Sequence, residues 1–223
     1  MNTPLRSLAS LFILGSLAWS VSLTGCATTY YKTMEVFGKE KLDILVSRVT
    51  DAREDQAEAK EQFKSALDRF SALVNAPESD LRKAYDTAKA DLERSEDRAA
   101  DVTKRIDAVE DVGSDLFEEW EKELAQYTSD TLREKSRAEL HSTRTKYDQM
   151  LAAMRQAEGK MEPVLDAFRD NVLFLKHNLN AQAVASMQGT VSSLESDIAA
   201  LIADMEKSMA EADRFVQDVG QQN

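Results

Sequence analysis

Apolar residues recur along the chain at alternating steps of three and four, which is the spacing of a heptad repeat. We call the stripe of residues at these positions the seam. In the first periodic stretch the seam residues are Leu42, Leu45, Val49, Ala52, Gln56, Ala59, Phe63, Ala66, Phe70 and Leu73. Charged residues fill the other faces, so the pattern predicts a long amphipathic helix that needs packing partners along its whole length.

Three further stretches continue this pattern. In the second stretch the seam residues are Leu81, Tyr85, Ala88, Leu92, Ser95, Ala99, Val102, Ile106, Val109, Gly113, Leu116 and Trp120. In the third they are Leu140, Arg144, Tyr147, Leu151, Met154, Glu158, Met161, Leu165, Phe168, Val172, Leu175 and Leu179. In the fourth they are Met187, Val191, Leu194, Ile198, Leu201, Met205, Ser208, Ala212, Phe215 and Val219. No stretch alternates as a strand would. The sequence therefore predicts an all-α fold, an elongated antiparallel coiled-coil-like bundle of about four long helices at residues 32–75, 79–127, 131–178 and 181–219.

Short polar stretches separate the predicted helices. Pro77 disfavours helix at the residue before it, and Ser79 or Asp80 can accept hydrogen bonds from the free amides of the second helix. Before the third helix, Thr131 and Glu134 have the spacing of a capping box. We therefore expect the second turn at residues 128–131.

Two positions disturb the helices without shifting the phase of the seam. Gly113 lies on the seam, where a glycine costs about 1 kcal/mol relative to alanine, so we expect either a close approach of two helices or a local weak point there. Pro163 interrupts the third helix, and we expect a kink between Gly159 and Pro163 and not a chain reversal.

Polar residues also occur on the seam, at Gln56, Arg144 and Glu158. A single buried polar group at such a position fixes the register of the helices, and the alternative is that these residues mark an exposed edge of the seam. Trp120 lies on the seam and is expected to be a core residue. Core packing is also the better explanation for the methionines, which are Met150, Met154, Met161, Met187, Met205 and Met209.

The first 25 residues have the features of a secretory signal, namely a charged start with Arg6 and an apolar run from Leu8 to Val21. The run ends in Leu23, Thr24, Gly25 and Cys26, and this order resembles the lipobox of bacterial lipoproteins. The resemblance implies that the signal is cut before Cys26 and that Cys26 carries the lipid. The residue after Cys26 is Ala27 and not Asp, which in the lipoprotein families of Gram-negative bacteria implies export to the outer membrane, facing the periplasm. The alternative is a buried cysteine behind an uncleaved signal.

The chain has a formal net charge of −12 and a single cysteine. An acidic surface without a basic patch repels phosphate backbones and anionic lipid, so nucleic acid is excluded as a partner and contact with a membrane has to come from the lipid. With Cys26 committed to the anchor, no thiol remains for a disulfide. The domain of residues 26–223 must therefore be stabilised by packing alone.

The sequence offers no catalytic or metal-binding pattern. The histidines are His141 and His177, and a di-iron site in a helical bundle would need Glu where the chain has Ala138 and Phe174. Motifs for a nucleophilic serine, a phosphate-binding loop or paired cysteine ligands are absent. We therefore expect no cofactor, no metal and no enzymatic activity.

An antiparallel order of helices places the turn at residues 75–80 and the turn at residues 178–180 at the same end of the bundle. These turns bring together Pro77, Lys176, His177, Asn178 and Asn180, which we consider a candidate partner-binding tip. The alternative is that Asn178 and Asn180 only end one helix and cap the next.

Three strings carry a likeness to a known family: Tyr30 and Tyr31 followed by Met34 and Glu35, the run from Ala59 to Leu67, and the run from Phe174 to Ala181. With these strings the chain resembles the bacterial lipoproteins catalogued as domain of unknown function 2959. The resemblance implies an all-helical, coiled-coil-rich periplasmic protein and supplies no reaction, ligand or catalytic residue.

Our leading hypothesis for the function is a lipid-anchored, non-enzymatic spacer, scaffold or adaptor of the cell envelope, bound to the membrane through Cys26 and to an unidentified envelope protein. The runner-up is a chaperone or carrier that opens to hold a hydrophobic peptide or lipid. An accessory subunit that activates an envelope enzyme is a third hypothesis. The periodicity is compatible with a monomer of four helices and with a homo-oligomer that shares its seams.

Overall fold

The computed structural model describes residues 26–74 and 78–220. The chain forms two compact units, Met1–Val36 and Phe37–Asn223. In the described part of the first unit, from Cys26 on, the chain is helical. In chain order the helices are α1 (Cys26–Val74), the 3₁₀ helix η1 (Glu78–Asp80), α2 (Leu81–Leu124), α3 (Asp130–Glu158), α4 (Met161–His177), α5 (Ala181–Ser186) and α6 (Gln188–Gly220). No strand occurs among the described residues, and the all-α prediction is confirmed.

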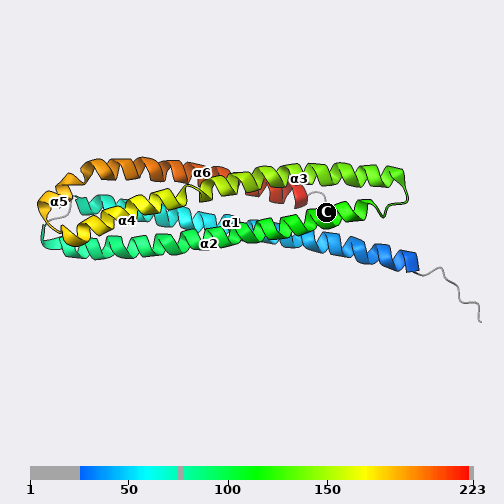
Figure 1. The fold of residues 1–223 in the computed structure, drawn as a ribbon, viewed down its shortest axis with the longest axis horizontal. Helices are drawn as coiled ribbons and strands as arrows, with labels where there is room; N and C mark the ends of the chain where they lie inside the picture. The colour runs from blue at the N-terminus through cyan, green and yellow to red at the C-terminus, as the bar shows by residue number, and fades with distance from the viewer. Residues whose placement is uncertain (1–25, 75–77, 221–223) are drawn as a thin grey trace, which may run out of the picture. The chain divides into compact units, whose positions relative to one another are not determined.

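In the second unit, each long helix lies antiparallel to two neighbours (Figure 1). Ion pairs fix this order: Lys41–Glu119 and Arg69–Asp91 between α1 and α2, Arg144–Glu121 and Arg169–Glu96 between α2 and the α3–α4 pair, Lys146–Asp218 and Lys160–Asp204 between that pair and α6, and Arg53–Asp213 and Lys60–Glu206 between α1 and α6. In every case a later residue on one helix pairs with an earlier residue on the other. The second unit is therefore the predicted antiparallel bundle.

Most seam residues lie in the core of this bundle, together with neighbours of the seam such as Phe117 and Met150. The largest side chains that are fully buried are Phe63, Phe70, Phe117, Phe168 and Phe215. Phe70 of α1 meets Phe168 of α4 edge to face, with 5.2 Å between the ring centroids. The methionines Met150, Met154, Met161, Met187 and Met205 are buried as well. Burying a side chain of this size contributes about 1.5–3 kcal/mol relative to leaving it exposed.

The polar seam residues divide between the two alternatives. Gln56 is fully buried, and the Ser208 hydroxyl of α6 donates a hydrogen bond to its Oε1 at 2.9 Å. Arg144 and Glu158 are only partly buried and form ion pairs with Glu121 and Arg155. Gln56 can thus fix the register of α1 against α6, while the other two residues mark the edge of the seam.

The predicted helix at residues 131–178 is two helices, because α3 ends at Glu158 and α4 begins at Met161. Pro163 lies in the first turn of α4, where its missing N–H is tolerated, and it cannot continue the hydrogen-bond ladder of α3. Both helices pack against α2 and α6, so the chain keeps its direction across the break. The expected kink is therefore present as a short interruption between α3 and α4, and the chain does not reverse there.

Two predicted helix starts are wrong in detail. The third helix is capped by Ser129 and not by a box at Thr131, since the Ser129 hydroxyl accepts a hydrogen bond from the Leu132 amide at 3.4 Å. The second helix is entered through η1, and the Asp80 side chain makes no capping bond. Both differences arise because several Ser, Thr and Asp residues near each turn could cap, and the path of the chain selects among them.

Candidate functional site

Two chain connections lie at the same end of the second unit (Figure 1). There α1 ends at Val74 and α2 begins at Leu81, and α4 ends at His177 before α5 leads into α6. Met187 separates α5 from α6, so the predicted helix at residues 181–219 is also two helices. We call residues 79–94 and 173–193 the tip. The connection between α2 and α3 lies at the opposite end of the bundle.

The predicted tip residues fall into two groups. Lys176 and His177 are exposed at the last turn of α4, where a cation is favoured by the helix dipole. Asn178 donates from Nδ2 to the Phe174 carbonyl at 2.9 Å, and the Asn180 Oδ1 accepts from the Ala183 amide at 2.9 Å. The two asparagines therefore hold the connection between α4 and α5, and Asn180 is the cap that the sequence suggested.

The remaining predicted site residues cannot be placed. Pro77 and the lipobox residues Leu23, Thr24 and Gly25 lie outside the described residues. Cys26 is the first residue of α1, and its side chain lies outside the described part as well. The lipid attachment thus stays a prediction.

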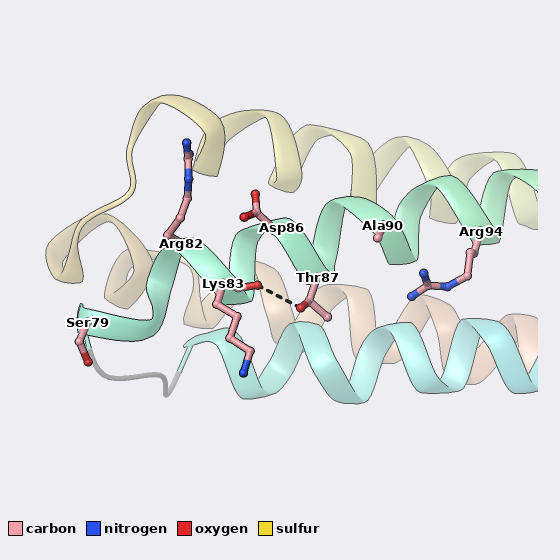
Figure 2. A pocket seen from close by; sticks show the side chains of 7 residues that line it. All are labelled: Ser79, Arg82, Lys83, Asp86, Thr87, Ala90 and Arg94. Atoms are coloured by element: carbon pink, nitrogen blue, oxygen red, sulfur yellow. Dashed lines mark hydrogen bonds between the residues drawn. The ribbon is translucent and has the colours of Figure 1, made fainter.

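A shallow groove of about 570 Å³ runs along the outer face of α2 at the tip. It is lined by Ser79, Arg82, Lys83, Asp86, Thr87, Ala90 and Arg94. Figure 2 shows Arg82 and Asp86 reaching toward α4, and Lys83 and Arg94 reaching toward α1. The Thr87 hydroxyl is tied to the Lys83 carbonyl at 3.0 Å. The groove therefore presents three cations and one carboxylate to solvent.

Arg82 differs from the other arginines that the structure describes, because each of those forms an ion pair and Arg82 does not. Lys83 and Lys176 likewise have no carboxylate within ion-pair distance among the described residues. Within the described part of the chain, these three cations therefore have no ion-pair partner. An uncompensated exposed cation is available to an anionic partner.

Arg94 lines the groove and also takes part in a polar cluster around the buried side chain of Asp91. It pairs with Asp91, which is 0% exposed, and Arg69 of α1 donates to the same carboxylate at 2.6 Å. The hydrogen bond to Asp91 raises the pKa of Arg69. Gln62 adds hydrogen bonds to the Asp91 carbonyl and the Ser95 hydroxyl, both at 3.3 Å. This cluster ties α1 to α2 beneath the groove.

The second connection of the tip carries no charge. From Asn178 to Leu194 the sequence contains no Asp, Glu, Lys or Arg, although these residues make up 30% of the whole chain. Apart from the cap Asn180, the exposed polar side chains of this run are hydroxyls and amides, contributed by Gln182, Ser186, Gln188, Thr190, Ser192 and Ser193. Next to it, Leu173 and Phe174 of α4 are exposed at 55% and 43%. The tip thus combines cations with an uncharged polar surface.

Other sequence candidates lie away from the tip. Trp120 is partly buried against the core, and its Nε1 donates to the Ser136 hydroxyl at 2.9 Å. His141 is exposed on α3. Within residues 26–74 and 78–220, no group of three or more His, Cys, Asp and Glu side chains is arranged to hold a metal ion. In the same part of the chain, none of the helices combines the length and the apolar character that a membrane span requires.

A second groove, of about 490 Å³, lies where α3 gives way to α4. Arg155 borders it and is held by Glu158, Glu110 and Asp107. Burial lowers the pKa of Arg155, but these hydrogen bonds outweigh it and raise the pKa. Arg169 also lines this groove and pairs with Glu96, Glu162 and Asp166. Because both arginines are already paired, the groove is better explained as part of the packing between α2 and the helix break.

Sequence reasoning missed Arg82 and Lys83. Their positions gave a signal, because they directly follow the seam residue Leu81 in the first helical turn after a predicted break. Residues at such positions are expected to be exposed near the turn. Their lack of carboxylate partners, however, depends on which side chains of α1 and α4 face them. That information is not contained in the heptad pattern.

The tip lies entirely within the part of the chain that matches a known family. No solved structure matches the chain. A family model described as "Protein of unknown function (DUF2959)" matches residues 30–219, which is most of the chain and includes every described helix except the first residues of α1 and the last residue of α6. The match agrees with the resemblance seen in the three sequence strings. This protein therefore belongs to the DUF2959 family of proteins of unknown function.

Proposed function

We propose that this protein is a lipid-anchored helical spacer and adaptor of the bacterial cell envelope. In this proposal Cys26 carries the lipid, the outer membrane holds the lipid on its periplasmic face, and the tip contacts the partner. The protein performs no chemical reaction. The function is mechanical: it keeps two components of the envelope at a defined separation.

The continuous core of the second unit is the observation that carries this proposal. Buried seam residues follow each other from Leu45 near the start of this unit to Leu73 at the tip, and α2, α4 and α6 supply buried partners. Ion pairs join neighbouring helices from Lys41–Glu119 near one end to Arg69–Asp91 near the other. A helix of 44 residues such as α2 extends about 66 Å. Helices that support each other over such a length resist bending, as a spacer requires.

The connectivity of the chain supports different roles for the two ends of the second unit, with the anchor joined to one end and the partner bound at the tip. The second unit begins at Phe37, and α1 then leads away from that point to the tip. Residues 27–36 join Cys26 to the end of the unit that lies opposite the tip. An anchor at Cys26 would therefore leave the tip available for a partner.

The carrier hypothesis receives less support from the packing. A carrier would have to present an apolar surface. Methionines could make such a surface adaptable, but they are buried in the core, with Met150, Met154 and Met205 at 0% exposure. Opening the bundle would expose these side chains and would break the ion pairs between the helices. A spacer uses the bundle as it stands.

Envelope fractionation with radioactive palmitate tests the anchor. We expect the natural chain to be labelled and to sediment with the outer membrane, whereas Cys26→Ser should remain an unlabelled, uncut precursor because serine has no thiol. Ala27→Asp serves as the matched control, since it should keep the label and move the protein to the inner membrane. Labelling of Cys26→Ser, with cleavage before residue 26, would contradict the proposal.

A further inference from the structure

The tip contrasts in charge with the rest of the molecule. The whole chain has a formal net charge of −12, yet Arg82, Lys83 and Lys176 lie at one end without carboxylate partners among the described residues. The other lysines without an ion pair in the described part, which are Lys64, Lys104, Lys135 and Lys207, lie singly along the length of the helices. Among the described side chains, Asp80 and Asp86 lie on the same stretch of chain as Arg82 and Lys83, and neither carboxylate is within ion-pair distance of a tip cation, so these cations are open to an acidic ligand.

The uncharged run beside these cations narrows the class of ligand. Hydroxyl and amide groups such as those of Gln182, Gln188 and Thr190 can donate and accept hydrogen bonds. They do so without the cost of removing a charge from water. Such groups match a ligand that is itself rich in hydroxyls and amides. The cations match carboxylates or phosphates on the same ligand.

A lipid bilayer fits the tip less well. Binding to a membrane surface uses an apolar face that enters the acyl boundary together with the cations. At the tip, Leu173 and Phe174 are the large apolar side chains that are exposed. The neighbouring surface on α5 and α6 consists of amides and hydroxyls, which gain nothing from entering hydrocarbon.

We propose that the tip binds the cell-wall polymer, whose glycan strands supply hydroxyls and whose short peptides supply amides and free carboxylates. In this assignment Arg82, Lys83 and Lys176 pair with carboxylates, and the polar run of α5 and α6 hydrogen-bonds to the sugars and peptide groups. This inference rests on the proposed envelope function, and it identifies what the tip holds. The protein would then link the outer membrane to the wall.

Co-sedimentation with purified, insoluble cell-wall sacculi tests this inference. The ligand is the sacculus itself, and the protein is the full lipidated chain in detergent micelles. The tip variant Arg82→Ser/Lys83→Ser/Lys176→Ser is compared with Lys104→Ser/Lys135→Ser/Lys207→Ser, which removes the same charge elsewhere. We expect the natural chain and the control variant to pellet with the sacculi, and the tip variant to bind roughly tenfold more weakly or worse, as loss of several charge-assisted contacts implies.

Two further arms identify the chemistry. The natural chain should no longer bind sacculi whose carboxylates have been converted to amides. This arm needs no protein variant, so it tests the inference even where a variant unfolds. Vesicles of anionic phospholipid should bind the natural chain no more strongly than vesicles of neutral phospholipid, because the lipid on Cys26 enters both kinds of bilayer alike. Equal loss in both triple variants, undiminished binding to amidated sacculi, or stronger binding to anionic than to neutral vesicles would overturn the inference.

The same experiment separates this inference from the proposed function. Sacculus binding is measured on purified protein and does not depend on where the protein is anchored in the cell. A chain that is labelled and sorted as expected but does not pellet with sacculi would keep its anchor and lose this ligand.

Discussion

The ring of Tyr147 on α3 lies directly against Gly113 on α2. A Cβ atom built on Gly113 would be 2.3 Å from Cζ of the ring, which is closer than side-chain atoms can approach. The Tyr147 hydroxyl donates to the carbonyls of Val109 at 3.3 Å and Glu110 at 3.4 Å. Gly113 is therefore on the seam because the second helix must leave room for an aromatic ring. Of the two sequence-based alternatives, close approach is the one observed.

Replacing Gly113 with alanine should destabilise the protein by about 1–3 kcal/mol, as overpacking of a core does. The ring cannot move aside freely, since Phe117 and Phe215 pack edge to face against it at 5.2 and 6.3 Å. This loss should exceed the gain of about 1 kcal/mol that alanine brings in helix propensity. Urea unfolding measures the difference.

Gly189 provides the control, because nothing lies within 4 Å of a Cβ at that position. Gly189→Ala should be neutral or slightly stabilising. If both alanine variants change the free energy of unfolding alike, the ring of Tyr147 does not restrict Gly113.

The same tyrosine predicts a loss of stability at alkaline pH. Burial raises the pKa of Tyr147 from 10.0 to about 12. Because the folded-state pKa lies above the unfolded one, the stabilising contribution is complete below pH 10 and is lost as the pH rises from 10 through 12. The amount is roughly 2–3 kcal/mol. Tyr147→Phe should lose about 1 kcal/mol at neutral pH with its hydrogen bonds, and should depend less on pH between 10 and 12.

Unfolding curves at a series of pH values, read by circular dichroism, measure this effect. The informative quantity is the difference in pH slope between the natural chain and Tyr147→Phe, since lysine deprotonation acts equally on both. Identical slopes above pH 10 would show that Tyr147 ionises as readily in the folded chain as in the unfolded one.

The cluster around Asp91 should respond asymmetrically to mutation. Removing both Arg69 and Arg94 by substitution with glutamine leaves a fully buried carboxylate without a cation, which costs about 3 kcal/mol or more. Asp91→Asn leaves two arginines whose side chains are 43% and 52% exposed, and these can turn to water. That change should cost only about 1–2 kcal/mol after allowance for solvent screening.

The control is Arg98→Gln/Arg137→Gln, which removes the surface ion pairs of Arg98 with Glu58 and Asp101 and of Arg137 with Glu134, and should cost less than about 1 kcal/mol in total. Thermal melts of the three variants at one pH suffice for the comparison. An Asp91→Asn variant that melts below the double arginine variant would show that the arginines, and not the carboxylate, bear the desolvation cost.

The heptad pattern predicted the bundle because a repeat of alternating threes and fours determines which face of each helix is buried. Residues such as Val49, Ile106 and Leu201 are fully or almost fully buried as a result. The pattern could not choose Ser129 over Thr131 as a cap, because both are hydroxyl residues beside the same turn.

The pattern also could not identify Arg82, because whether a cation has an ion-pair partner depends on which side chains of other helices face it. Asp91 was missed for the same reason: it is adjacent to the seam residue Leu92, and only the arrangement of α1 and α2 reveals that it is buried.

The two groups of tip residues should separate capping from binding. Asn180→Ala removes the cap of α5 and should lower stability by about 1 kcal/mol while leaving sacculus binding unchanged. Lys176→Ser should lower stability by only about 0.3 kcal/mol, the low end of what an exposed cation at a helix C-terminus contributes, and should weaken binding. The control at the opposite end has to be Lys135→Ser. Arg133 is unsuitable, since it donates to the Tyr127 carbonyl at 2.7 Å and pairs with Asp130, so its loss would disturb the turn itself.

Melting temperature and co-sedimentation measured on the same samples give both stability and binding. A Lys176→Ser variant that melts early, or an Asn180→Ala variant that no longer pellets with sacculi, would show that the two roles are not separate.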